Sequence, residues 1–390
     1  MFKRVLLVAT VPSMIGQFNM NNIRILQQMG LQVDVAANFS DYSVWPKERV
    51  ELFCKELEEN QIEWFQVDFS RKAFNVWKHI SSLKQLVCLI KERKYSFVHT
   101  HTAIASAITR VATKKTNTFV IYTAHGFSFY KGCPAKNKIV FFPVEWLLSN
   151  YTDILITINN EDYEIAQRSF KAKKVERIHG VGIPIKDFVG SKDIRNRVRN
   201  SLGIKEDEVL LLSVGELDGL KNHIEIIKAM EELERNGFKL IIAGEGDLKS
   251  HHQEYINGHG LENSVKLLGY RNDIADLLTA ADIFVFPSYI EGLSVALMEA
   301  IAAKKLIACS EIRGNVDTVI TPCSYFKPDD TSTLITTIQR VNNLSSKEKS
   351  WMVETNYNNL RQFSADRVNE EMKEIYQRAY MMINNEEEEK

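Results

Sequence analysis

The chain has 390 residues, of which 45% are hydrophobic and 25% charged, the composition of an ordinary globular protein large enough for two cores. This composition excludes a disordered chain, a collagen-like repeat and a disulfide-rich scaffold. Five widely spaced cysteines without a CxxC pair indicate neither a zinc site nor a disulfide framework. No window holds the roughly 18–20 apolar residues of a membrane-spanning helix, and the apolar run at 5–9 is too short for a signal peptide. We therefore expect a cytoplasmic protein that binds no metal.

The charge is divided unevenly along the chain. Residues 1–190 contain 25 Lys and Arg against 17 Asp and Glu, whereas residues 191–390 contain 24 against 33. An excess of positive charge in the first half suits contact with an anionic partner. Chance together with the acidic run at 386–389 explains the division equally well.

The first half alternates short apolar runs with amphipathic stretches. Strands are predicted at 5–9, 33–37, 62–67, 96–100, 119–123, 154–158 and 175–178. Ile80, Leu83, Val87 and Ile90 recur at helical spacing and predict a helix over 76–92, and Gly30 suits the end of an earlier helix. Strands that alternate with helices predict a parallel sheet covered on both faces.

After a polar region at 186–207 the same pattern starts again. Strands are predicted at 209–214, 239–243, 265–267, 283–287 and 306–308, a helix from about Lys221 to Asn236, and helical structure over 345–384 before an acidic tail. The predicted fold class is α/β, with two facing doubly wound, Rossmann-like domains. Their predicted bounds are 1–190 and 191–365, with a C-terminal helix and tail over 366–390. Ligands of such sheets bind beyond the carboxyl ends of the strands, so we expect a cleft between the domains.

The most informative segment, FPSYIEGLSVALMEAIAA, covers residues 286–303. A helix is predicted to begin around Leu293 or Ser294, so the amides of Gly292, Leu293 and Ser294 lie at a helix N-terminus, which attracts phosphate. Glu291 and Glu299 lie about 12 Å apart if the intervening residues are helical. That spacing suits two carboxylates that hold the two ends of a nucleotide sugar. Alternatively, Glu291 caps the helix and Glu299 lies on its exposed face.

A second segment, LSVGELDGLKNH at 212–223, predicts a strand, a turn with glycine and the start of a helix. Lys221 at such a turn can direct its ammonium group at a phosphate above the sheet. The alternative is a surface lysine, which the positive end of the helix dipole disfavours.

Three further candidates carry weaker signals. Gly16 follows the first strand, where a missing side chain allows a ligand to approach the backbone. His125 ends a predicted strand, next to polar residues such as His101 at the end of the preceding one. Arg271 follows another strand, where it either supports a base or phosphate or pairs with Asp273 on the surface.

The segment at 130–150 places basic side chains beside a large apolar face. This pattern favours an interfacial helix against anionic lipid or a lipid-linked acceptor. A core helix with a solvated basic end has the same pattern. The candidate residues are Lys131, Lys136, Lys138, Phe141, Phe142 and Trp146.

The ordered set of motifs resembles that of retaining GT-B glycosyltransferases of family 4, and most closely the bacterial enzymes that build capsular, exopolysaccharide or lipid-linked oligosaccharide chains. The motifs are VLLVATVPS at 5–13, VHTHTAIAS at 98–106, YTAHGFSFYKG at 122–132, ITINNEDYEIA at 156–166, GVGI at 180–183, VGEL and KNH within 214–223, AGEGDL at 243–248, LGYRNDI at 268–274 and EGLSVALMEAIAA at 291–303. They span nearly the whole chain. No Walker A loop, GxSxG elbow, DxD at a strand end or nucleic-acid-binding motif accompanies them.

The resemblance implies roles for the candidate residues. Glu291 lies near the hydroxyls of the donor sugar, Glu299 binds the ribose, and Lys221 binds the donor diphosphate. Gly16 approaches the same diphosphate from the other domain, and His125 lies next to the transferred sugar. The catalytic candidates are thus His125, Lys221 and Glu291. The resemblance also implies that residues 1–190 bind the acceptor, that residues 191–365 bind the donor, and that the helix in 366–390 crosses back onto the first domain.

Three positions depart from the pattern. Glu216 replaces an arginine common in relatives, Ser294 replaces a proline, and Lys304-Lys305 follows Ala303 where a glycine is common. Of the three, the change at Glu216 bears on the site, because it leaves Lys221 as the expected phosphate ligand.

The expected activity is transfer of a sugar from a nucleotide diphosphate-sugar, a UDP-sugar, to a glycan on undecaprenyl diphosphate at the inner face of the plasma membrane. Configuration is retained, and neither a cofactor, a metal nor a nucleic-acid partner is expected. Two alternatives remain. A nucleotide-sugar epimerase of the same fold would form product from the donor alone, and a non-catalytic partner subunit would bind donor or membrane without turnover.

Overall fold

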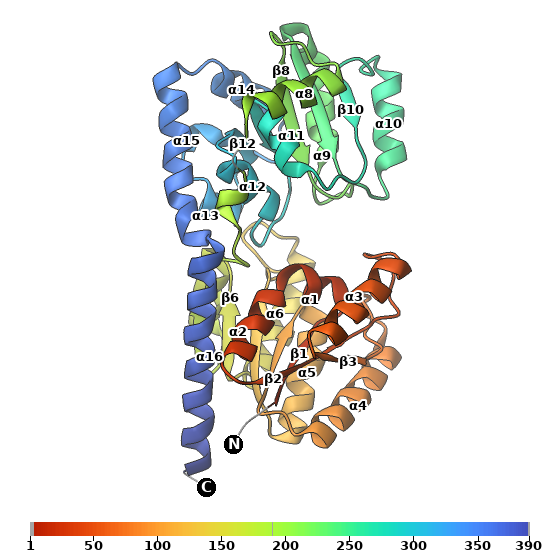
Figure 1. Cartoon of the computed structure of the whole chain (residues 1–390), viewed down its shortest axis with the longest axis vertical. Helices are drawn as coiled ribbons and strands as arrows, with labels where there is room; N and C mark the ends of the chain where they lie inside the picture. Colours follow the sequence, from red (N-terminus) through yellow and green to blue (C-terminus); the bar gives the residue numbers. More distant parts are fainter. Residues whose placement is uncertain (1–3, 189, 389–390) are drawn as a thin grey trace. The chain divides into compact units, whose positions relative to one another are not determined.

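The computed structural model of the chain describes residues 4–188 and 190–388. It divides into two compact units (Figure 1). The first unit combines Met1–Val181 with Asp366–Lys390, and the second is Gly182–Ala365. No helix in the described part of the chain is long and apolar enough to cross a membrane.

The first unit is built on a seven-stranded parallel sheet in the order β3-β2-β1-β4-β5-β6-β7. Its strands are β1 Arg4–Val8, β2 Gln32–Ala37, β3 Glu63–Gln66, β4 Phe97–His101, β5 Phe119–Ala124, β6 Ile154–Thr157 and β7 Lys174–Arg177. The strand order reverses between β1 and β4, where Leu7 pairs with His99. This is a doubly wound sheet, as the sequence predicts.

Helices cover both faces of this sheet. They are α1 Pro12–Phe18, α2 Met20–Gln28, α3 Lys47–Glu59, α4 Val76–Arg93, α5 Ala103–Thr116, α6 Ala135–Ser149, α7 Asn160–Ser169 and α16 Ala365–Glu388. On one face, Leu86 and Ile90 of α4 and Ile108 of α5 pack against Leu6 and Val98 of the sheet. The long helix α16 belongs to this unit and runs along one side of it (Figure 1). The helix reaches Glu388, so the backbone of the acidic run is helical as far as the structure describes it.

The second unit repeats the same strand order in a six-stranded parallel sheet, β10-β9-β8-β11-β12-β13. The strands are β8 Val209–Val214, β9 Phe238–Ala243, β10 Val265–Leu267, β11 Ile283–Phe286, β12 Leu306–Ser310 and β13 Tyr325–Phe326. The helices are α8 Lys192–Leu202, α9 His223–Leu233, α10 Lys249–Gly258, α11 Ile274–Ala280, α12 Val295–Ala302, α13 Asn315–Thr318, α14 Thr331–Asn342 and α15 Ser346–Leu360. The strand order reverses between β8 and β11.

Alternate residues of the central strands face opposite sides of this sheet, as strand geometry requires. Leu210 and Leu212 pack with α8, α11 and α12, whereas Leu211 packs with α9 and α14. Both faces are therefore buried. This explains why strands of this sheet are continuous apolar runs in the sequence.

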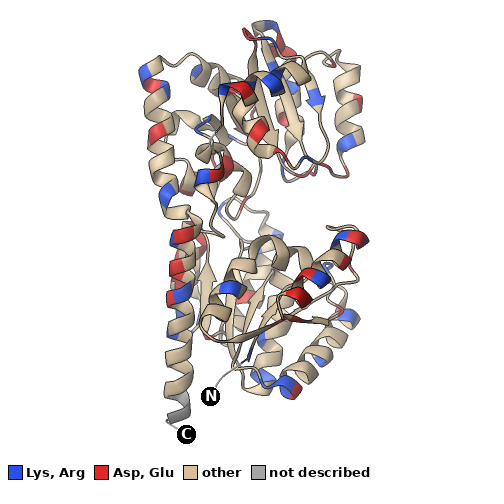
Figure 2. Ribbon diagram, viewed as in Figure 1, with Lys and Arg blue, Asp and Glu red and all other residues tan. Residues whose placement is uncertain are grey.

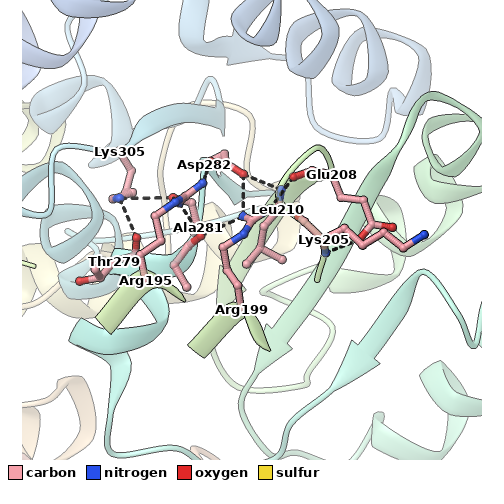
Figure 3. Close-up of polar contacts among 10 residues, drawn as sticks. Arg195, Arg199, Lys205, Glu208, Leu210, Thr279, Ala281, Asp282 and Lys305 are labelled. Atoms are coloured by element: carbon pink, nitrogen blue, oxygen red, sulfur yellow. Dashed lines mark hydrogen bonds and ion pairs between the residues drawn. The ribbon is translucent and has the colours of Figure 1, made fainter. Parts of the chain in front are cut away.

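The amino edge of the second sheet is held by a charged network around Asp282 (Figure 3). Its carboxylate accepts from the amide of Leu210 at 2.8 Å and pairs with Arg195 at 2.6 Å and Arg199 at 3.1 Å. The ammonium of Lys305 donates to the carbonyl of Ala281 at 3.2 Å. Arg195 and Arg199 belong to α8, so their ion pairs with Asp282 hold this helix against the sheet. The polar region predicted at 186–207 therefore contains a helix that belongs to the second unit.

Candidate functional site

The loop after β8 presents Lys221 at the carboxyl edge of the second sheet. The carboxylate of Asp218 accepts from the backbone amides of Leu220 at 2.9 Å and Lys221 at 2.8 Å, so the loop closes on itself. Asn222 adopts a left-handed conformation, and α9 begins only at His223, two residues after the predicted start. Lys221 is therefore a loop residue just outside the helix N-terminus.

The loop after β11 meets the loop after β8 and presents Glu291. The amide of Tyr289 donates to the carbonyl of Leu220 at 2.8 Å, which joins the two loops. The Lys221 Nζ lies 2.6 Å from Glu291 Oε1, and the two side chains are 26% and 10% exposed. The structure thus brings together two of the predicted donor residues, 70 positions apart in the sequence, where the strand order reverses.

Such a reversal of strand order is where ligands of doubly wound sheets bind. The arrangement also has an energetic consequence. A carboxylate that is nine-tenths buried depends on its cation, because removal of one partner leaves an uncompensated charge. An anion that binds Lys221 must therefore compete with the Glu291 carboxylate for the ammonium group.

Glu299 lies in the middle of α12 and is half-buried. No hydrogen bond or ion pair joins its carboxylate to another of the described side chains, and loss of hydration raises its pKa to about 7. A half-buried carboxylate that accepts no hydrogen bond from the protein can accept one from a hydroxyl of a ligand. Glu299 therefore does not lie on a fully solvated helix face, and its role as a ligand-binding carboxylate stays a prediction.

The predicted phosphate-binding amides lie immediately before α12. Ser294 caps the helix, since its hydroxyl accepts from the amide of Leu297 at 3.3 Å. Gly292 and Leu293 are half-buried in the loop. Gly314 adopts φ 78° and packs so closely that an added Cβ would lie 2.6 Å from the carbonyl oxygen of Gly292. The loop after β12 therefore closes over the segment that carries these amides.

Two other predicted donor residues lie in settings that the structure explains without a ligand. Arg271 pairs with Asp273, with Nε at 2.7 Å from Oδ1, which is the second of the two expected arrangements. Gly16 lies inside α1, where an added Cβ would lie 2.5 Å from the ring of Trp45 and 3.1 Å from that of Phe53. Packing accounts for the glycine, and the donor-binding roles of both residues stay predictions.

His125 belongs to a group of three histidines in the first unit, of which His99 and His101 are buried and His125 is half-buried. It follows β5, and its Nε2 lies 3.1 Å from Nδ1 of His101 on the adjacent strand β4. His99, two residues before His101, bonds Tyr376 of α16 at 2.8 Å and Thr123 of β5 at 2.8 Å. Desolvation lowers the pKa of His125 to about 4 and that of His99 to about 3.

All three imidazoles are therefore neutral at physiological pH, because desolvation also lowers the pKa of His101 well below its usual value. A neutral His125 can donate or accept a hydrogen bond but brings no positive charge. Nε2 of His101 is buried without a hydrogen-bond partner. The sequence places these histidines at strand ends, but their mutual contacts depend on the strand order.

The acceptor candidates lie on α6 and the loop before it, and they do not share one exposed face. Phe142 packs against Phe129 and Phe170, with ring centroids 5.3 and 5.8 Å apart. Phe141 faces a cavity inside the unit. Trp146 is 39% exposed, with Lys171 4.6 Å from its ring centroid.

The three lysines among the acceptor candidates, Lys131, Lys136 and Lys138, are exposed. Among the described residues no group of three His, Cys, Asp or Glu side chains is placed to hold a metal ion.

Sequence reasoning missed two residues that order the loops carrying Lys221 and Glu291. Asp218 orders the loop that carries Lys221, and its place two residues before Leu220 is typical of a turn-forming aspartate. Arg313 is buried after β12 and donates from Nε to the carbonyl of Glu291 at 3.1 Å. No local signal in the sequence indicates that contact.

Family models match most of each unit. A family model described as Glycosyltransferase Family 4 matches residues 16–181, and one described as Glycosyl transferases group 1 matches residues 194–358. The chain is 32% identical over 322 residues to a Bacillus subtilis (strain 168) protein named glycosyltransferase EpsD, an alignment that covers 81% of this chain and 80% of that protein.

Two further relatives are informative. The Escherichia coli protein named UDP-Gal:alpha-D-GlcNAc-diphosphoundecaprenol alpha-1,3-galactosyltransferase is 28% identical over 299 residues, which cover 71% of this chain and 76% of that protein. The crystal structure of HepE from Anabaena in complex with UDP and glucose has a TM-score of 0.75 at 18% identity and covers 96% of this chain and 99% of that one. The likeness to HepE is one of fold. Both units thus have the GT-B architecture that the motifs predict.

Proposed function

This chain belongs to the family 4 glycosyltransferases, and from that premise we propose that it transfers a sugar from a UDP-sugar to a glycan carried on undecaprenyl diphosphate. The Escherichia coli relative is named for a UDP-sugar and a diphosphoundecaprenol acceptor, and HepE was solved with UDP. The proposed role is in surface polysaccharide synthesis at the inner face of the plasma membrane. The observation that carries the proposal is the contact between Lys221 and Glu291, with the unpartnered Glu299 on the helix that follows.

In this proposal the donor lies across the carboxyl edge of the second sheet. Lys221 and the amides of Gly292 and Leu293 bind the diphosphate, Glu291 accepts from the sugar hydroxyls, and Glu299 accepts from the ribose. As the bond to the sugar breaks, negative charge grows on the diphosphate, and a preorganised cation stabilises it. No metal is needed for this role.

The proposed transfer retains the configuration of the donor sugar. The acceptor hydroxyl attacks from the face that the diphosphate leaves, and a diphosphate oxygen takes the hydroxyl proton. A protein base is not required for this step. His125, which is neutral, contributes a hydrogen bond near the transferred sugar rather than a charge.

The test is a donor screen with the full chain, a lipid-linked glycan acceptor and no added metal, measured by release of nucleoside diphosphate and by extension of the glycan. Lys221→Met should lower the rate by roughly 100-fold or more, the cost typical of a lost electrostatic stabiliser. Glu299→Gln should weaken donor binding.

Lys304→Met is the matched control for the lysine variant. Lys304 also pairs with a glutamate, Glu354, at 2.7 Å, but it precedes β12 at the opposite edge of the same sheet. Its activity should match the unmodified chain. Full activity in both Lys221→Met and Glu299→Gln would refute the site. Product formed from the donor without acceptor would indicate an epimerase instead.

A further inference from the structure

The first unit contains an apolar cavity of about 470 Å³ between α4, α5 and α6. Its walls include Ile80 and Leu83 of α4, Ala107 and Val111 of α5, and Val140 and Val144 of α6. This volume lies within the range of pockets that bind small molecules. The cavity is formed within one unit and depends on no other part of the chain.

The cavity opens to solvent through apolar side chains. Phe74 is 86% exposed, and Ile80, Val140 and Val144 are each between 40% and 47% exposed. Isolated apolar residues are common on protein surfaces, but a contiguous group around a cavity marks a binding site. An apolar ligand that entered here would remove this surface from water, which is favourable in proportion to the buried area.

Two polar residues in the cavity wall differ in their partners: the carboxylate of Glu145 is paired by the protein, whereas Nδ1 of His79 is buried without a hydrogen-bond partner. Glu145 lines the cavity, and its carboxylate pairs with Arg110 at 2.8 Å. The hydroxyl of Tyr122 donates to the same carboxylate at 3.4 Å. Because Glu145 is paired and most of the wall is apolar, the cavity suits a hydrocarbon.

Basic residues flank the opening on both sides. Lys72 lies in the loop before α4, Lys78 lies in the first turn of α4, and Lys136 and Lys138 lie in the first turn of α6, all of them exposed. Helix α4 carries three further residues of the same sign and one acid along its length (Figure 2). A hydrocarbon chain with an anionic head group matches this distribution of apolar surface and positive charge.

The cavity shares two wall residues with a second cavity at the polar end of the first sheet. Ala103 and Ile104, at the start of α5, line both this cavity and a second one of about 340 Å³. The second cavity contains Thr10 and Arg71 and lies where the strand order reverses between β1 and β4. On its other side, the apolar cavity reaches Gly126, the residue after His125.

We propose that the cavity between α4, α5 and α6 binds the first isoprene units of the lipid carrier of the acceptor. The diphosphate then lies among the flanking lysines and Arg71, and the glycan continues into the second cavity. This inference rests on the proposed function, since that function supplies a polyprenyl diphosphate as the carrier. It assigns α6 to one wall of a lipid-binding cavity, so Val140, Phe141 and Val144 contact a single lipid chain rather than a bilayer surface.

Direct binding tests the cavity without any transfer reaction. The probes are geranylgeranyl diphosphate and inorganic diphosphate, each titrated into the full chain by calorimetry. The prenyl compound should bind at least tenfold more tightly than inorganic diphosphate, since burial of even two methylene groups is worth roughly that factor. Equal affinities for the two probes would overturn the proposal.

Two neighbouring residues of α6 provide a matched pair of variants. Val140 lines the cavity, whereas Ile139 is 72% exposed and lies outside it. Val140→Gln should weaken binding of geranylgeranyl diphosphate roughly tenfold, and Ile139→Gln should leave it unchanged. Ala107→Phe, which fills the cavity from α5, should weaken binding without a change in melting temperature. Equal losses at Val140 and Ile139 would overturn the cavity in favour of a flat membrane-binding face.

The transfer assay separates this proposal from the proposed function. With acceptors of long and short lipid chains, Val140→Gln should raise the KM for the long-chain acceptor and leave the KM for the donor unchanged. Transfer with no dependence on lipid length would overturn the cavity and keep the function. Tight prenyl binding without transfer from any donor would keep the cavity and overturn the function. Sedimentation that shows a dimer dissociated by Val140→Gln would assign the surface to a second copy and overturn the proposal.

Discussion

Glu299 is predicted to make the stability of the chain depend on pH, and Glu299→Gln should remove that dependence. Burial without a partner raises the pKa of this carboxyl to about 7, from an ordinary value of 4.5. Below pH 4.5 the group is protonated in both the folded and the unfolded chain. As the pH rises toward 7, the unfolded chain loses the proton first, so the folded state becomes progressively less stable.

The size of the effect follows from the shift. Each pKa unit corresponds to about 1.4 kcal/mol, so a shift of this size corresponds to roughly 3 kcal/mol lost between pH 4.5 and pH 8. Glutamine resembles the protonated carboxyl in shape and stays neutral. Glu299→Gln should therefore match the unmodified chain near pH 5 and exceed its stability at pH 8 by up to about 3 kcal/mol. For a unit of this size that difference is several degrees in melting temperature.

The assay is thermal unfolding of both proteins at pH 5 and pH 8, with and without UDP. Glu232→Gln is the matched control, because Glu232 is an exposed carboxylate on α9 of the same unit. Its difference from the unmodified chain should be equally small at both pH values. UDP should reduce the advantage of Glu299→Gln at pH 8, because a ribose hydroxyl that donates to the ionised carboxylate replaces the lost hydration.

Two results would refute this reasoning. A Glu299→Gln variant that is less stable than the unmodified chain at pH 8 would mean that the carboxylate has a stabilising partner. A constant difference at pH 5 and pH 8 would mean that the carboxyl does not titrate in this interval. The expected result pairs a gain in stability with a loss in donor binding, which is the behaviour of a residue kept for function.

Two further predictions concern packing and the charged network. Gly16→Ala should destabilise the first unit by about 1–3 kcal/mol, because the added methyl group overpacks against Trp45. The double variant Gly16→Ala with Trp45→Leu should regain both stability and activity. A double variant that regains stability but not activity would instead support contact between Gly16 and the donor. Asp282→Asn should lower the free energy of unfolding by about 3–5 kcal/mol in a urea titration, because two arginines lose their carboxylate. The control is Asp276→Asn, which breaks a more exposed pair with one arginine and should lower the free energy of unfolding by less than about 1 kcal/mol.

Much of the fold could be predicted because parallel strands buried on both faces are marked by apolar runs. Strands β8 Val209–Val214 and β10 Val265–Leu267 begin and end where the sequence predicts. The sequence did not predict helix α8, which lies in the polar region at 186–207, and the reason is physical. Arg199 occupies its inward face and is only 4% exposed, so a buried position carries a charged residue that a hydropathy pattern assigns to solvent.

The site could be predicted residue by residue but not as a set of contacts. The sequence predicts a helix start around Leu293 or Ser294, and in the structure Ser294, rather than Glu291, is the N-cap of α12. The bond between Lys221 and Glu291 depends on two strands that are neighbours only after the order reverses. The apolar cavity likewise requires helices from three separate parts of the sequence, so no single segment reveals it.

The titratable groups at the predicted site differ between the two units: the histidines of the first have lowered pKa values, and Glu299 of the second has a raised pKa. This difference predicts which group gives transfer its pH dependence. In the first unit, desolvation keeps His101 and His125 neutral, and the pKa of His125, about 4, places its titration below the physiological range. In the second unit, the pKa of Glu299 is about 7. Donor affinity should therefore rise with pH through a single ionisation near 7, because the ionised carboxylate is the stronger acceptor. The residual activity of Glu299→Gln should be flat from pH 6 to pH 8, and a profile that survives this substitution would place the ionisation on another group.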